Sequence, residues 1–180
     1  LVRYLLQQYP GEVLRYVLLS SHYRSEQNFS KELLDSAWRT LDSLYGFIRG
    51  LAPAESHLNS AGDGFKALLD DLNTPVAISE LYRLAKAVNQ ADGPEQLALM
   101  QELKGLSDIL GLLQQDPEQW FTLTRGNDQL SAEQIEQQIQ ARHQAKHDKD
   151  FSQADQIRQQ LLDAGVVLED SREGTKWRRA

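Results

Sequence analysis

Cysteine is absent from the 180 residues of the sequence. Disulfides, thiolate catalysis and cysteine-based zinc sites are therefore excluded for this chain, and the absence fits a reducing compartment. No apolar run approaches the roughly 20 residues that a membrane-spanning helix needs. The N-terminus also lacks the charged start and apolar centre of a signal peptide. We therefore expect a cytoplasmic protein that makes no contact with a membrane.

Motifs for nucleotide chemistry and metal binding are also missing. There is no Walker loop, and Gly62-Asp-Gly64 lacks the third glycine and the preceding strand of a dinucleotide-binding fingerprint. No Glu-x-x-His motif is present to build a metal centre inside a helical bundle. His143 and His147 stand four residues apart, but no third ligand is evident, so a solvent-exposed helix face is favoured. We expect no catalytic residue, metal or cofactor in this chain.

Methionine occurs once, at Met100, and the sequence starts at Leu1. We therefore expect this chain to be a fragment of a longer protein. Its hydrophobic fraction of 41% is sufficient for a folded core, and 180 residues are compatible with one domain or with two or three small ones.

Positive charge is in short supply, because 19 Lys and Arg residues face 26 Asp and Glu residues, for a net charge of −7. This balance argues at first against a nucleic-acid partner. The acidity is concentrated in residues 52–132, where five cations face twelve anions, whereas residues 133–180 hold eight against nine. A local cationic patch near the C-terminus is therefore compatible with the overall charge.

Apolar residues at three- and four-residue steps predict helices over most of the first 110 residues. Ser30 is placed to cap a long helix that runs to Ile48, and residues 51–64 have the composition of a linker. A short helix is expected from Phe65 to Leu72. Asn73-Thr-Pro75 would start the next helix of a bundle.

The last fifty residues predict a different architecture. Ser131-Ala-Glu-Gln134 has the spacing of a capping box, so a helix should start there. A second amphipathic helix would end at Gly165. Val166 to Leu168 and Thr175 to Arg179 are strand candidates joined by a turn, and such a hairpin needs the helices for support.

Cations and aromatic residues in this last region suit a nucleic acid. Arg142, Lys146 and Lys149 stand at steps of four and three, which predicts that they lie along one helix face. Cations can meet phosphates, and acidic side chains can accept hydrogen bonds from base amino groups. The candidate residues for nucleic-acid binding are Arg142, Lys146, Lys149, Phe151, Asp155, Asp170, Trp177, Arg178 and Arg179.

Two interpretations of these residues stay open. In the first, Asp155 and Asp170 accept from bases while Phe151 and Trp177 stack on them. In the second, the acids pair with neighbouring cations inside the chain, and the two rings fill the core between the hairpin and the helices.

Two smaller clusters also admit two roles each. His22, Tyr23 and Arg24 lie in a polar loop and would either contact phosphate or pin that loop to the following helix. Asp70 and Asp71 flank a helix boundary, where acidic residues favour the N-terminus of the following helix. A structural role for these two acids is favoured over acid–base chemistry.

Five ordered motifs resemble one family across nearly the whole chain. They are Leu14-Arg-Tyr16, Ser21-His-Tyr-Arg-Ser25 with Asn28-Phe-Ser30, Asp71-Leu-Asn-Thr-Pro75, the segment from Arg142 to Asp155, and Gly165-Val-Val-Leu-Glu-Asp170 with Gly174-Thr-Lys-Trp-Arg-Arg179. In this order they resemble the C-terminal part of bacterial cysteinyl-tRNA synthetase, a class I aminoacyl-tRNA synthetase. The ATP-binding motifs and zinc-binding cysteines of that family are missing here.

The resemblance implies a mainly α fold in three parts. Residues 1–51 would hold the end of a stem-contact region and the first long bundle helix. Residues 52–130 would form an antiparallel helical bundle of DALR type. Residues 131–180 would form a small α+β anticodon-binding module of two helices and a β-hairpin.

The resemblance also implies a function. The parent enzyme would ligate cysteine to tRNA(Cys) through an adenylate, using ATP, magnesium and zinc, whereas this segment would bind tRNA without catalysis or a cofactor of its own. The nine candidates above would serve the anticodon, while His22, Tyr23 and Arg24 would contact the tRNA stem, in a monomer. The alternative is a stand-alone, non-catalytic helical module that binds RNA or protein.

Overall fold

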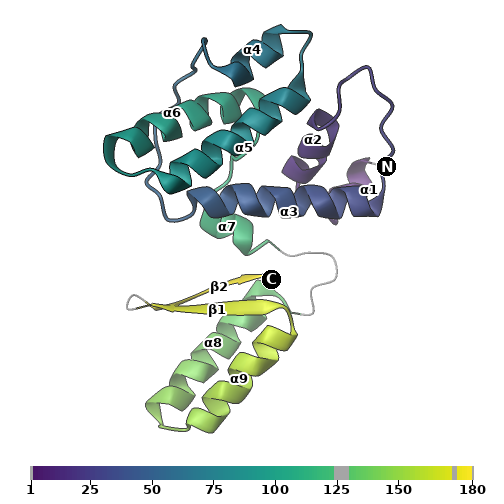
Figure 1. Ribbon diagram of the computed structural model, residues 1–180. Helices are drawn as coiled ribbons and strands as arrows, with labels where there is room; N and C mark the ends of the chain where they lie inside the picture. The colour runs from purple at the N-terminus through teal and green to yellow at the C-terminus, as the bar shows by residue number, and fades with distance from the viewer. Residues whose placement is uncertain (1, 124–129, 172–173, 180) are drawn as a thin grey trace. The chain divides into compact units, whose positions relative to one another are not determined.

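A computed structural model of the chain describes residues 2–123, 130–171 and 174–179. The chain forms two compact units, Leu1–Pro117 and Glu118–Ala180. The described residues of the first unit are helical, and those of the second add an antiparallel hairpin (Figure 1). The predicted fold class is therefore confirmed. None of the helices in these residues is both long and apolar enough to span a bilayer.

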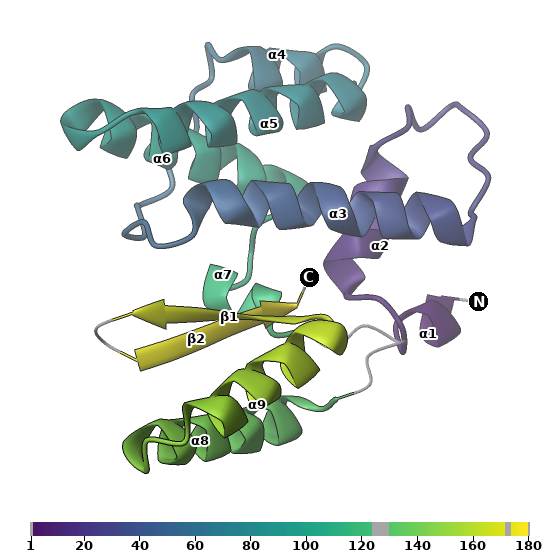
Figure 2. The ribbon, with the colours of Figure 1, turned by 60° about the horizontal axis from the view of Figure 1, so that its bottom comes forward.

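The first unit is organised around one central helix. Its described helices are α1 (Val2–Leu5), α2 (Gly11–Leu19), α3 (Lys31–Ile48), α4 (Asp63–Leu69), α5 (Thr74–Gln90) and α6 (Gly93–Leu110). Helix α5 packs against α3, α4 and α6 (Figure 1, Figure 2). Ala77, Leu81, Leu84 and Val88 are buried along α5 at steps of three and four, as an amphipathic helix requires.

Local caps start two of these helices at the predicted residues. The Ser30 hydroxyl accepts the Leu33 N–H at 3.2 Å, and the Asn73 side chain accepts the Val76 N–H at 3.4 Å. The prediction that the short helix continues to Leu72 is wrong. Helix α4 ends at Leu69, because Asp71 and Leu72 have φ angles of 51° and 53°, in the left-handed region.

The segment between α3 and α4 has no regular structure, as its composition predicts, yet it is attached to α6. The His57 N–H donates to the Gln101 carbonyl at 3.0 Å, and the Asn59 amide donates to Glu102 Oε1 at 2.9 Å. At Gly105 a Cβ atom would lie 2.3 Å from the His57 carbonyl oxygen. The segment therefore passes along α6 at a distance that only glycine at residue 105 permits.

A buried carboxylate joins three segments of the first unit. Glu12 on α2 accepts the Tyr45 hydroxyl of α3 at 2.9 Å and the Leu113 N–H, which follows α6, at 2.7 Å. The Tyr45 oxygen accepts in turn from the Gln115 N–H at 3.1 Å. Burial raises the pKa of Glu12 above its ordinary value, and the hydrogen bonds from Leu113 and Tyr45 only partly oppose that shift.

The second unit is a helical pair covered by a hairpin. Its elements after α7 (Pro117–Phe121), which crosses the unit boundary, are α8 (Ala132–His147), α9 (Phe151–Asp163), β1 (Val166–Ser171) and β2 (Gly174–Arg179). The predicted capping box is confirmed, since Ser131 and Gln134 exchange hydrogen bonds at 2.8 and 3.2 Å. Gly165, with φ 78°, follows the end of α9 as predicted.

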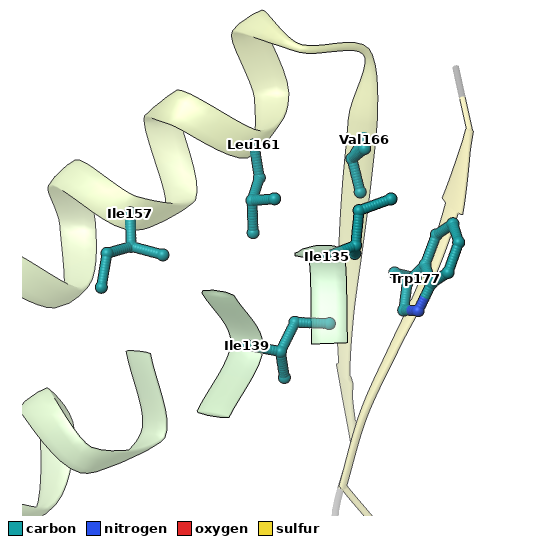
Figure 3. Packing of buried hydrophobic residues seen from close by; sticks show 6 residues of the cluster. All are labelled: Ile135, Ile139, Ile157, Leu161, Val166 and Trp177. Atoms are coloured by element: carbon teal, nitrogen blue, oxygen red, sulfur yellow. The ribbon is translucent and has the colours of Figure 1, made fainter. Parts of the chain in front are cut away.

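The core of the second unit is small. Its buried members come from both helices and both strands, and are Ile135, Ile139, Ile157, Leu161, Val166 and Trp177 (Figure 3). A core of this size contributes about 3–5 kcal/mol to the free energy of folding, so polar contacts matter to the stability of this unit.

Candidate nucleic-acid interface

A two-point ion pair joins α8 to the hairpin. Arg142 donates from Nη1 and Nη2 to the two carboxylate oxygens of Asp170 at 2.9 and 2.7 Å. The strand register brings Asp170 there, because residues 166, 168 and 170 share the strand face on which Val166 packs into the core. The Arg142 side chain is 4% exposed and that of Asp170 is 45% exposed. One end of the pair is therefore buried while the carboxylate stays accessible.

Two further side chains contact Asp170, and a third contacts one of them. Lys146 Nζ lies 3.4 Å from Oδ2, and the hydroxyl of Thr175, the cross-strand partner, donates to Oδ1 at 2.6 Å. Thr175 Oγ1 also lies 3.1 Å from His143 Nε2. The hydrogen bonds from Arg142 and then Thr175 hold the pKa of Asp170 well below its usual range. Asp170 is therefore a carboxylate acceptor at neutral pH.

Trp177 is part of the core of the second unit. Its side chain is 6% exposed, and its indole N–H donates to Glu136 Oε1 at 2.6 Å. The ring packs among the isoleucine and leucine side chains of α8 and α9 (Figure 3). In this conformation Trp177 fixes the hairpin on the helices and does not present a free face to a base.

The two terminal arginines point in different directions. Arg179 is buried, donates to the Leu130 carbonyl at 3.0 Å and lies over the Trp177 ring at 5.6 Å. Arg178, on the opposite strand face, is half-buried and donates to Glu169 at 3.0 Å. Four residue steps separate the Val166 end of the hairpin, which holds Arg179, from the Asp170 end, roughly 13 Å.

The exposed candidates gather at the turn between α8 and α9. Phe151, the first residue of α9, is 63% exposed, and Asp155 is exposed one turn later. The hydrogen bond to Asp170 raises the pKa of Arg142, and the charge of Asp155 makes a smaller contribution in the same direction. The prediction that Lys149 shares the α8 face is wrong. Helix α8 ends at His147, and Lys149 follows in the turn with φ 63°.

The structure thus brings together some of the predicted residues and separates others. Arg142, Lys146 and Asp170 are in contact, whereas Arg178 and Arg179 lie elsewhere on the hairpin. Sequence reasoning missed Thr175 as a neighbour of Asp170 and His143 as a neighbour of Thr175. The signal for Thr175 lay in the turn, since a turn closed by Ser171 and Gly174 places Thr175 opposite Asp170.

In the first unit, the loop with His22, Tyr23 and Arg24 is pinned to Asp71. The Tyr23 hydroxyl donates to Asp71 at 2.7 Å, and this bond raises the pKa of Tyr23. Arg24 and His22 lie 3.3 and 3.7 Å from the same carboxylate. The expected pinning of the loop is present, but the anchor is the turn between α4 and α5 rather than the following helix α3.

The described part of the chain contains no group of three or more His, Cys, Asp or Glu side chains arranged to hold a metal. His143 contacts Thr175, and His147 lies 3.3 Å from Asp148.

Two family models match the chain. Residues 65–114 match the DALR domain, and residues 128–178 match the cysteinyl-tRNA ligase anticodon binding domain. The first match covers α4 to α6, and the second covers the helical pair and the hairpin. Together they agree with the resemblance found in the sequence motifs.

Curated relatives carry the name cysteine–tRNA ligase. The protein of Saccharophagus degradans is 49% identical over 99% of this chain and 39% of its own length. Those of Rhodospirillum centenum and Marinobacter nauticus are 47% and 44% identical, also over 99% of this chain, and over 39% and 40% of their own lengths. The chain thus spans about two-fifths of the length of these relatives, in their C-terminal part. This chain is therefore similar, over nearly its whole length, to the C-terminal part of cysteine–tRNA ligases.

Proposed function

We propose that the chain is the tRNA-recognition part of a cysteine–tRNA ligase and that its second unit binds the anticodon loop of tRNA(Cys). The match of residues 128–178 to the anticodon-binding family is the observation that carries this proposal. Attachment of cysteine, with its need for ATP, magnesium and zinc, would belong to the remaining length of the full protein. The segment would bind tRNA without catalysing that reaction.

The exposed residues around the α8–α9 turn are the proposed contacts. Phe151 offers a ring on which a base can stack, and Lys146 and Lys149 offer charge to the phosphates. Asp155 and the accessible edge of Asp170 would accept hydrogen bonds from base amino groups. This arrangement combines a stacking platform, cations and acceptors within one small surface.

The buried candidates would act indirectly. Arg142 would hold Asp170 in a fixed orientation, and Trp177 with Arg179 would keep the hairpin seated on the helices. Arg178, on the other strand face, would meet the RNA backbone only if the RNA reached around the hairpin edge. We therefore assign base recognition to Asp155 and Asp170, and rigidity to the buried residues.

His22, Tyr23 and Arg24 are the proposed contacts to the tRNA stem. The side chains of Tyr23 and Arg24 are mostly exposed, which supports a role at the surface. We place the protein in the cytoplasm, where translation occurs, and propose that it binds tRNA as a monomer.

Binding to the anticodon stem-loop of tRNA(Cys) tests the anticodon assignment. We expect tighter binding than to a stem-loop with a scrambled anticodon, and affinity that falls as salt rises, because phosphate contacts release counterions. Equal affinity for both loops at low salt would overturn the assignment and favour a protein-binding module.

Exchange of Asp155 for Asn separates recognition from folding. We expect weaker discrimination against other anticodons, by about 1–3 kcal/mol for a lost base contact. The matched control is Asp163→Asn on the same helix. Within the described residues, the Asp163 carboxylate accepts a hydrogen bond from the Gln159 side chain. If both variants discriminate as well as the parent chain, Asp155 does not read a base.

A further inference from the structure

One carboxylate anchors the His22-Tyr23-Arg24 segment of a loop in the first unit. Asp71 takes a hydrogen bond from Tyr23 at 2.7 Å and lies 3.3 Å from Arg24 and 3.7 Å from His22. The 48 residues that separate Tyr23 from Asp71 in sequence make this a tertiary contact. Residues 20–30 contain no helix or strand, so the loop depends on such contacts for its order.

The turn that presents Asp71 has an unusual backbone. Asp71 and Leu72 both have positive φ, 51° and 53°, although neither is glycine. Hydrogen bonds on each side fix the turn, because the Asn73 N–H donates to the Ala67 carbonyl at 3.0 Å and Asn73 caps α5. Leu72 is exposed, so burial of its side chain does not compensate for the strain. A strained turn that persists in this way suggests a functional constraint.

The three anchored side chains form a stack in which Tyr23 and Arg24 are exposed and His22 is half-buried. The His22 and Tyr23 rings lie 4.7 Å apart at 28°, and the Arg24 guanidinium lies 5.2 Å from the Tyr23 ring centre. Tyr23 is 58% exposed and the Arg24 side chain 68% exposed. A ring stack with an outward guanidinium offers charge for phosphates and flat faces for riboses or unpaired bases.

Stability alone does not account for this arrangement. Ion pairs between exposed side chains contribute little, because solvent screens the charges and the side chains lose freedom. Two adjacent residues in the left-handed region cost at least a comparable amount. The anchor therefore adds little to the folded state as a whole, whereas it fixes the direction of three side chains that suit RNA.

We infer that Asp71 is a positioning residue that orders the His22-Tyr23-Arg24 stack for contact with the tRNA stem. The inference rests on the proposed tRNA-binding function and extends it to a residue in the turn between α4 and α5. An RNA partner would then bind a loop that is already ordered. The loop therefore loses less conformational freedom on binding.

Two variants of Asp71 and one neighbour test the anchor in the 180-residue chain. Asp71→Gly removes the carboxylate and suits the positive φ, and Asp71→Asn removes the charge while keeping an acceptor for Tyr23. Asp70→Asn makes the same charge change one residue earlier and is the matched control. Trypsin cleavage after Arg24 reports loop order without any RNA, and tRNA(Cys) binding reports function.

We expect Asp71→Gly to speed cleavage after Arg24 and to weaken tRNA(Cys) binding, each by about fivefold, with Asp71→Asn intermediate. Asp70→Asn should change neither, and urea unfolding should move little in all three variants. If Asp71 acts through the loop, Arg24→Ala should weaken binding, and adding Asp71→Gly to it should weaken binding little further.

Unchanged cleavage after Arg24 in Asp71→Gly would overturn the anchoring role. Faster cleavage with unchanged tRNA binding would overturn the RNA role of the loop. Faster cleavage with tighter tRNA binding would overturn the positioning role of Asp71, because Asp71 would then compete with phosphate for Arg24. Failure of the proposed function is distinguishable, since the parent chain would then not bind tRNA(Cys), whereas the cleavage rates would still report the anchor.

Discussion

A carboxylate joins distant segments in each unit of the chain, Glu12 in the first and Asp170 in the second, and the two have opposite environments. Glu12 is buried among neutral donors, the Tyr45 hydroxyl and the Leu113 N–H, and burial raises its pKa. Asp170 is half-exposed beside Arg142, which lowers its pKa. The sign of the shift therefore follows from whether burial or the contacts to the carboxylate dominate, because burial outweighs the charge of Arg15 at Glu12 whereas the Arg142 contact outweighs burial at Asp170.

The two carboxylates also differ in whether a binding partner could reach them. In the first unit the carboxylate is enclosed and serves packing, whereas in the second it remains open to a partner. Three changes test this contrast.

The largest effect is expected in the core of the second unit. Trp177→Ala should lower the free energy of unfolding by about 3–5 kcal/mol, because it leaves a cavity in a core of six residues. A loss of this size equals what the core contributes, so the second unit should be largely unfolded without denaturant. Urea unfolding gives the total, and amide hydrogen exchange shows which unit loses protection. Phe151→Ala, which removes an exposed ring nearby, should stay within about 0.5 kcal/mol. Similar losses for both variants would show that burial does not separate their roles.

A smaller loss is expected when the buried carboxylate of the first unit is removed. Glu12→Ala should cost about 2–3 kcal/mol, because it removes a buried carboxylate that accepts from the Leu113 N–H and the Tyr45 hydroxyl. Glu12→Gln, which keeps an acceptor, should cost less. Glu26→Ala in the exposed loop is the control. A Glu12→Ala variant as stable as this control would remove the basis of the comparison.

The smallest effect is a pH dependence of opposite sign in the two units. The folded pKa of Glu12 is raised, so its contribution to stability is full below the unfolded value of about 4.3 and is lost as pH rises through the folded pKa. The folded pKa of Asp170 is lowered, so its contribution is present above about 3.9 and is lost as pH falls. Glu12→Gln and Asp170→Asn should each remove one dependence. Hydrogen exchange at pH 3 to 7 would contradict this if both units responded with one sign.

Features set by neighbouring residues were predictable from the sequence. Ser30, Asn73 and the Ser131–Gln134 box cap helices through contacts three residues apart, and Gly165 ends α9 by its own backbone freedom. The prediction from residue spacing was wrong for Lys149, because it assumed that the helix continues past His147. Residue spacing alone does not show where a helix ends.

Long-range partners were not predictable in the same way. Glu12 reaches a backbone amide 101 residues away, and Asp71 reaches a loop 48 residues away. Whether Trp177 faces the core or solvent depends on the strand register, since a shift of one residue reverses every side chain. The family motifs identified the candidate residues. Only the burial of each side chain in the structure separates the candidates that a partner could contact from those that support the hairpin.

The close approach of His57 to Gly105 has a consequence for how this protein can vary. The segment before α4 has the composition of a tether, yet residue 105 has no room for even one methyl group, because the obstacle is backbone and not a movable side chain. A survey of all single substitutions should therefore find that the polar segment before α4 tolerates substitutions along its own length. Substitutions at residue 105, on the helix beside this segment, should not be tolerated. Insertions or deletions between α3 and α4 should be accepted only where His57 can still lie against residue 105.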